Sequence, residues 1–196
     1  MTRQEWGFER VAGGYAVHLA EPERGVLTDV VDQVVELLGG AHQAPDGRLH
    51  PLQAVRLGDE PVAAPEDAAL RRLLPDGSRG DPEVAAEYRR LTEHELRATK
   101  TDHLGRLRAV LADPGAVLDP AAAPGVASAL TDVRLVLAER LGIRDEADAD
   151  AMHRLAVTGG DVDETDDGMR VLLATVSAIL GVLLESLIDL MTDELP

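Results

Sequence analysis

The chain has 196 residues, 45% of them hydrophobic and 28% charged, and a formal net charge of −17, which indicates one globular domain over 1–196 and excludes a disordered chain. The absence of cysteine excludes disulfides, thiolate metal sites and a thiol redox switch. So acidic a surface repels phosphate backbones and anionic lipid, so nucleic-acid binding would need a local cationic patch or a basic partner.

The N-terminal part of the chain predicts a β-hairpin over residues 6–20. Apolar and polar residues alternate on both sides of Gly13 and Gly14, which supply the positive φ angles of a tight turn. We expect the aromatic residues Trp6, Phe8 and Tyr15 to anchor this ribbon on a helical body. Residues 1–8 contain no basic segment followed by an apolar one, so no export signal is indicated and a cytoplasmic location is expected.

Two helices and a long loop are predicted next. A broad apolar face indicates a helix over 22–38, which Pro22 opens in its first turn. Residues 41–65 are rich in proline, glycine and charge, so we expect a surface loop there, followed by a short helix over 66–74. His42 and His50 lie in the loop without partners at metal-ligand spacing.

A longer helix over 82–112 is indicated by Asp81, a good N-cap, and by Pro82 in the first helical position. Val84, Tyr88 and Leu91 belong to an apolar side of this helix that continues toward its C-terminus. Beside it runs an arc of basic residues, which is the candidate partner-binding surface. This cationic stripe consists of Arg89, Arg90, Arg97, Lys100 and Arg108. Ion pairing with nearby glutamates is the alternative interpretation of the same residues.

The helix predicted over 126–141 has apolar residues at spacings of three and four, and Gly142 is placed to cap it. Arg140 lies at the edge of its apolar face and is expected to be half buried, so it needs a carboxylate partner. We expect that structural ion pair to be made with Glu95. An acidic helix over 145–157 follows.

The last predicted helix, 167–191, is apolar on nearly every face, and we expect other helices to cover almost all of it. Its uncharged run from Val171 to Leu184 is shorter than the ~20 residues of a membrane span, so no membrane partner is expected. The line Ala174, Ser177 and Gly181 would permit close approach of another backbone. The fold class is therefore mainly α: a helical bundle around a buried C-terminal helix, with a small N-terminal hairpin.

No motif nominates a catalytic residue, a metal site or a cofactor. His94 and Glu95 begin a zinc-protease pattern, but Ala98 stands at the second histidine position. Asp163 begins a partial match to a calcium loop, in which Ala174 replaces the final glutamate. Phosphate loops, dinucleotide-binding glycine patterns and nucleophile elbows are absent from the sequence.

Two stretches resemble the actinobacterial oxidative-stress regulator family, long filed as a domain of unknown function. The first runs from Leu73-Leu74-Pro75-Asp76 to Asp81, Glu87-Tyr88-Arg89-Arg90-Leu91-Thr92-Glu93, Leu96-Arg97 and Lys100. The second is Ala129-Leu130-Thr131-Asp132-Val133-Arg134-Leu135 through Arg140-Leu141-Gly142, and Pro22-Glu23-Arg24 is similar too.

That resemblance implies a cytoplasmic, non-enzymatic transcriptional regulator that contacts a protein such as a sigma factor or RNA polymerase. DNA is a further candidate partner. The best understood member senses oxidants through cysteines, which this chain lacks. Two alternatives from other classes stay open: a homodimeric interaction or scaffold protein that uses the last helix, and a small enzyme with converging carboxylates or histidines.

Overall fold

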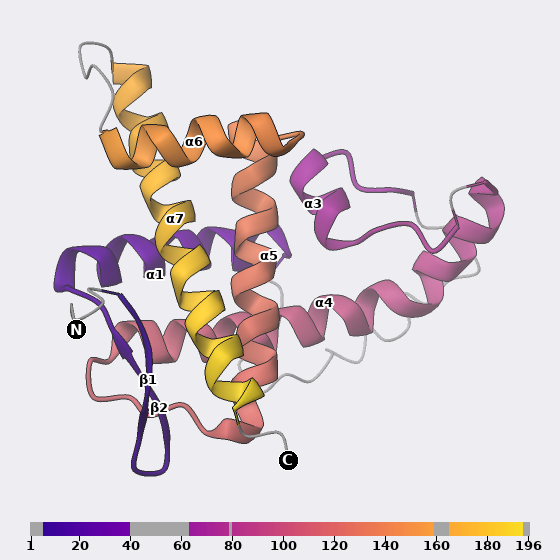
Figure 1. The fold of residues 1–196 in the computed structure, drawn as a ribbon. Coiled ribbons are helices and arrows are strands. Elements are labelled where there is room, and N and C mark those ends of the chain that lie inside the picture. The colour runs from indigo at the N-terminus through magenta and orange to yellow at the C-terminus, as the bar shows by residue number, and fades with distance from the viewer. Residues whose placement is uncertain (1–5, 40–62, 79, 159–164, 194–196) are drawn as a thin grey trace.

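The computed structural model describes residues 6–39, 63–78, 80–158 and 165–193, and it is mostly helical with a two-stranded antiparallel hairpin, as expected (Figure 1). The strands are β1, Gly7–Val11, and β2, Gly14–His18. The helices are α1 Glu21–Leu37, α3 Ala68–Leu73, α4 Pro82–Ala112, the 3-10 turn η2 Pro120–Ala122, α5 Ala123–Leu141, α6 Glu146–Thr158 and α7 Thr165–Thr192. Most of the predicted 41–65 loop, including His42 and His50, lies outside the described residues.

Local capping explains where the helices begin and end. Asp81 accepts hydrogen bonds from the amides of Glu83 and Val84, at 3.0 and 3.2 Å, which satisfies two free donors of α4. Gly142 ends α5 in the left-handed conformation, at φ +71°. The start of α5 lies three residues before the predicted Val126, because η2 runs directly into it and a proline is tolerated in its first turn.

The hairpin is fixed to the helical body by its buried aromatic residues and its backbone. Phe8 and Tyr15 are buried, and the Tyr15 backbone exchanges two hydrogen bonds with Leu118, at 2.9 and 2.8 Å. A Cβ on Gly14 would lie 2.0 Å from the Leu118 carbonyl oxygen, so only glycine permits this approach. Ser186 of α7 accepts a hydrogen bond from the Phe8 amide at 2.9 Å. The predicted anchoring role is confirmed for Phe8 and Tyr15, and Trp6 is partly buried against the core.

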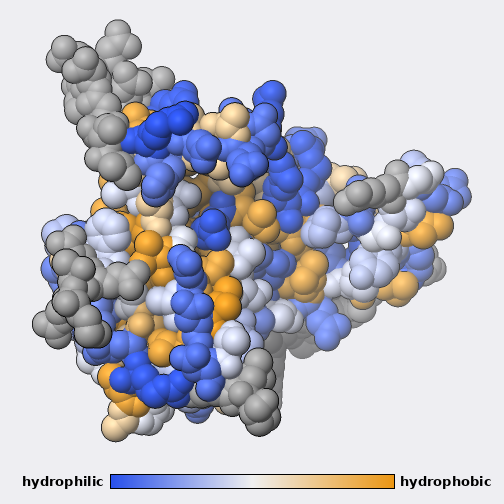
Figure 2. All heavy atoms as spheres, in the orientation of Figure 1, coloured by the Kyte–Doolittle hydropathy of each residue, from blue (hydrophilic) through white to orange (hydrophobic). Residues whose placement is uncertain are grey.

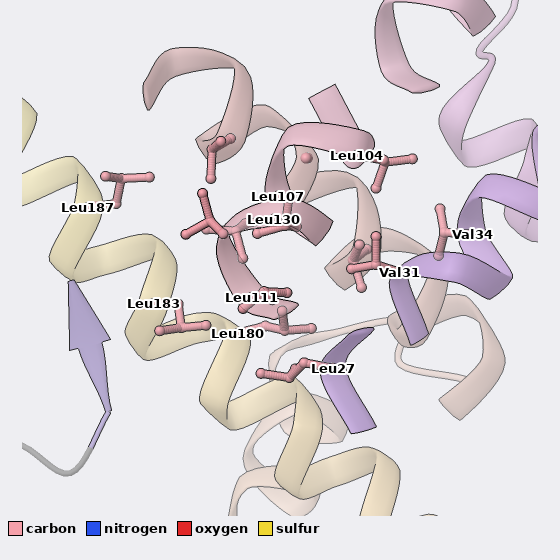
Figure 3. Packing of buried hydrophobic residues seen from close by; sticks show 14 of the residues in the cluster. Leu27, Val31, Val34, Leu104, Leu107, Leu111, Leu130, Leu180, Leu183 and Leu187 are labelled. Carbon is pink, nitrogen blue, oxygen red and sulfur yellow. The ribbon is translucent and has the colours of Figure 1, made fainter. Parts of the chain in front are cut away.

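The core lies where α1, α4, α5 and α7 meet, and leucine and valine side chains from these helices interlock there (Figure 3). In Figure 1, α5 and α7 run side by side, and α6 crosses them near one end. The fully buried side chains labelled in Figure 3 are Leu27, Val31, Val34, Leu104, Leu107, Leu111, Leu130, Leu180, Leu183 and Leu187.

The C-terminal helix packs against its neighbours, but the expectation of nearly complete cover was wrong. Only 39% of its most apolar 18-residue window is buried. The α1, α5 and β1 elements pack against α7 and α6 crosses it toward its N-terminal end, while Met169, Leu172 and Ile188 are exposed. By length and hydropathy alone, both 120–141 and 168–192 could cross a membrane, a test that core helices of soluble proteins also pass. The expectation of no membrane partner stays a prediction.

Arg24 is the one arginine in this core that bonds only to backbone carbonyls among the described residues. Its guanidinium donates to Val17 O and Leu111 O, both at 2.9 Å, and to Leu19 O at 3.3 Å. Leu111 lies in the last turn of α4, where unsatisfied carbonyls carry the negative end of the helix dipole. One buried cation thus joins the hairpin, the start of α1 and the end of α4.

Replacing Arg24 with Met should lower the free energy of unfolding by about 3 kcal/mol, because buried carbonyl oxygens would lose their donors. Urea denaturation followed by circular dichroism measures this change. Arg106→Met removes an exposed pair with Asp102 and should change stability by less than about 1 kcal/mol. Equal effects of the two substitutions would contradict the anchoring role of Arg24.

Candidate functional site

Three of the five basic residues of the cationic stripe pair with carboxylates from other elements. Arg89 is buried and pairs with Asp76. Lys100 Nζ lies 2.7 and 2.9 Å from the two carboxylate oxygens of the buried Asp132, which joins α4 to α5. These contacts hold the fold together, and they leave little free positive charge on the stripe.

The third such residue is Arg108, which donates to Asp32 Oδ1 at 2.6 Å and so joins α4 to α1. The hydrogen bond and charge of Asp32 raise the pKa of Arg108 further above its already high usual value.

The other two residues of the stripe pair within α4. Arg90 makes two bonds to Glu87, at 2.9 and 2.7 Å, and Arg97 donates to Glu93 at 2.9 and 2.8 Å. Arg97 also reaches the carbonyl of Leu38, at 3.1 Å. The Arg90 hydrogen bond lowers the pKa of Glu87, which keeps that carboxylate charged. Every residue of the stripe therefore has an acidic neighbour, and its role in partner binding stays a prediction.

Arg140 bonds to an acidic side chain, as expected, but the partner is Asp67 and not Glu95. The distance from Arg140 Nη2 to Asp67 Oδ2 is 2.6 Å, and the Arg140 side chain is about half exposed. Glu95 is exposed on α4. Instead α3 packs against α5, which brings the N-cap of α3 to Arg140. The hydrogen bond from Arg140 is the main cause that lowers the pKa of Asp67.

The first half of α4 carries an exposed apolar stripe. It consists of Val84, Tyr88 and Leu91, which are 53%, 50% and 63% exposed. Their spacing of four and three residues places them on one face of the helix. This part of the helix projects beyond the bundle in Figure 1, and Figure 2 shows hydrophobic residues on the projecting part. Tyr88 lies against Gly77, where a Cβ would come within 2.4 Å of the ring. We call Val84, Tyr88 and Leu91 the docking stripe.

A groove of about 730 Å³ lies between α5, α6 and α7. Its wall on α7 includes the small residues Ala174, Ser177 and Gly181, and Leu135 of α5 borders it. A Cβ on Gly181 would meet nothing within 4 Å, so close packing inside one subunit does not explain this glycine. Glycine inside a helix costs about 1 kcal/mol relative to alanine.

Ionisable side chains are sparse in this groove. Among the described residues, its lining contributes only Arg134, His153 and Glu185. The described part of the chain also contains no group of three or more His, Asp or Glu residues that could hold a metal ion. Asp163 of the partial calcium pattern lies outside the described residues.

Nearly the whole chain matches one known protein family. A family model described as "Domain of unknown function (DUF2017)" matches residues 2–191. The chain belongs to the DUF2017 family. No curated protein and no solved structure matches the chain. Membership agrees with the resemblance only in that the family is a domain of unknown function; it assigns neither an activity nor a regulatory role.

Replacing Asp67 with Ala should lower the free energy of unfolding at pH 7 by about 1 kcal/mol, since α3 loses its N-cap. Asp67→Asn keeps a capping oxygen and should cost less. The pKa of Asp67 is lowered in the folded state, so its charge stabilises the fold above the unfolded pKa of about 3.9. That contribution is lost as the pH falls through the lower, folded-state pKa.

Denaturation from pH 6 to pH 3 measures this dependence. The difference between the wild type and Asp67→Asn should narrow as the pH falls, because protonation removes the charge that distinguishes them. A difference that grows toward low pH would contradict the assigned pair with Arg140.

Proposed function

We propose that this protein is a non-enzymatic transcriptional regulator that acts in the cytoplasm by contacting a transcription protein, such as a sigma factor or RNA polymerase. The observation that carries the proposal is the docking stripe. Three large apolar side chains at helical spacing stand in solvent on a projecting helix, and such anchors are typical of protein recognition. The absence of cysteine excludes a thiol switch.

The resemblance to the oxidative-stress regulators supports the same surface. One of the stretches that carries it, 87–93, includes two residues of the docking stripe, Tyr88 and Leu91. In that stretch, Arg89 pairs with Asp76 and steadies the turn beside α4, while Tyr88 and Leu91 remain accessible. This stretch thus contains Arg89, which pairs with Asp76 beside α4, and two exposed apolar residues, Tyr88 and Leu91, that a partner could contact.

Charge favours a protein partner with basic residues around an apolar centre. The chain carries a net charge of −17, and Glu83 and Glu87 are exposed beside the docking stripe. An acidic surface accelerates the encounter with a basic protein surface, and it repels the phosphates of DNA. The cationic stripe offers little compensation, since each of its residues has a carboxylate neighbour. We therefore propose that the partner, and not this chain, makes the main contact with DNA.

An enzymatic role is disfavoured by the lining of the groove. Active sites usually bring together ionisable groups with shifted pKa values in a concave pocket. Among the described residues, the groove has one arginine, one histidine and one glutamate in a largely apolar wall. Binding of a protein partner accounts for the exposed apolar residues of the docking stripe, and it requires no catalytic residues in the groove.

Replacing Val84 and Leu91 together with Ser should reduce capture of RNA polymerase or a sigma factor at least tenfold, because the apolar contact is removed. Affinity purification from the native host, with quantitative mass spectrometry, measures capture. The variant should keep the wild-type circular dichroism spectrum, since both side chains are exposed. The matched control is Met169→Ser, another exposed apolar residue, on α7. Undiminished capture by the double variant, or no transcription protein captured by the wild type, would refute the proposal.

A second variant tests the cationic stripe itself. Replacing Arg90, Arg97 and Arg108 with Ser removes two pairs within α4 and the link between α4 and α1. We expect a lower melting temperature with capture largely retained at a temperature where the variant is folded. If this variant loses capture while the docking-stripe variant still binds, the basic residues and not the docking stripe make the partner contact.

A further inference from the structure

The groove face of α7 has a composition that packing within one chain does not explain. A helix buried on one side usually carries long polar residues on the other, whereas α7 lines the groove mainly with small or apolar residues and has one charged residue there, Glu185. Gly181 lies at mid-helix with open space beside it, in a position where alanine would favour the helix. A surface of this kind suits close approach by another helix.

The charges along the same face are of both signs and lack internal partners. Arg134 of α5 and Glu185 and Asp189 of α7 line the hollow that continues the groove past Gly181. All three side chains are exposed, and none makes an ion pair with a described residue. A basic residue on one helix and acidic residues on the next form a pattern that is complementary to itself when rotated by 180°.

We propose that a second copy of this chain occupies the groove, so that the protein is a symmetric dimer. A two-fold axis close to Gly181 would place α7 of each subunit against α5 and α7 of the other. Arg134 would then face Glu185 of the partner subunit, and the reverse contact would follow by symmetry. Exposed Leu135 and Ile188 would be covered by the same contact. Figure 2 shows hydrophobic and hydrophilic residues interspersed on this face, where α5 and α7 run side by side.

Other occupants satisfy these observations less well. A small carboxylate ligand that reached Arg134 would be repelled by Glu185 and Asp189, which line the same hollow. A lipid bilayer would have to bury these three charged side chains. A second copy brings charges of both signs, together with the exposed apolar residues Leu135 and Ile188. The dimer surface is separate from the docking stripe on α4, so the dimer and the proposed function can fail independently.

The test uses sedimentation equilibrium of the full chain at low salt. The wild type should show twice the monomer mass of 20.9 kDa. Arg134→Glu should weaken dimerisation at least tenfold, because the new glutamate of each subunit would face Glu185 of the partner subunit. Glu185→Arg should do the same, because the new arginine would face Arg134 of the partner subunit. An equimolar mixture of these variants should regain the dimer, since each charge then meets its opposite at both symmetric contacts.

Two further variants complete the experiment. Gly181→Leu adds a large side chain where a Cβ has open space, so it should be monomeric with an unchanged circular dichroism spectrum. Arg106→Glu is the same charge reversal at an exposed site of α4 outside the groove, and it should remain dimeric. A monomeric wild type at high concentration would overturn the proposal. Single reversals as dimeric as the wild type, or a mixture that stays monomeric, would overturn it as well.

Discussion

The guanidinium of Arg24 is the interaction on which the assembly of this fold depends. It binds backbone carbonyls from the end of the hairpin, from the approach to α1 and from the last turn of α4. A buried charge is costly unless its hydrogen bonds are made, so these segments must meet correctly before the arginine is stable inside. The bond to Leu111 also holds the C-terminal end of α4 against the start of α1, while the opposite end of α4 projects from the bundle.

The two long helices α4 and α7 each have one part that packs in the core and another part that is exposed. The second half of α4 enters the core through Leu104, Leu107 and Leu111, while its first half carries exposed apolar residues. In α7 the division runs along the helix, with one side in the core and the other on the groove. Loss of an exposed apolar side chain costs little stability, whereas core truncation costs about 2–5 kcal/mol. Substitutions on these surfaces can therefore separate binding from folding.

Much of the fold follows from local signals in the sequence. Asp81 with Pro82 gives the start of α4, Gly142 gives the end of α5, and the glycines at 13 and 14 give the hairpin, because capping and positive φ depend on adjacent residues. The pairs of α4 at spacings of three and four, such as Arg90 with Glu87, are local in the same way.

Contacts between distant elements could not be predicted in this manner. The partner of Arg140 depends on where α3 docks against α5, and helical periodicity does not specify that position. The carboxylates that pair with Arg89, Lys100 and Arg108 come from elsewhere in the chain, at Asp76, Asp132 and Asp32. The bonds of Arg24 to backbone carbonyls leave no signature in the residue types. The groove arises from the crossing of α6 over α5 and α7, which helical periodicity does not specify.

The ion pair between Lys100 and Asp132 has a consequence for covalent chemistry. Lys100 is the only lysine of the chain, and its side chain is 15% exposed with its ammonium bonded to both carboxylate oxygens. Acylation or isopeptide conjugation at a lysine requires a neutral, accessible amine. The ion pair with Asp132 holds that amine in the folded molecule, so the rate of acetylation at this position would report how often the pair opens.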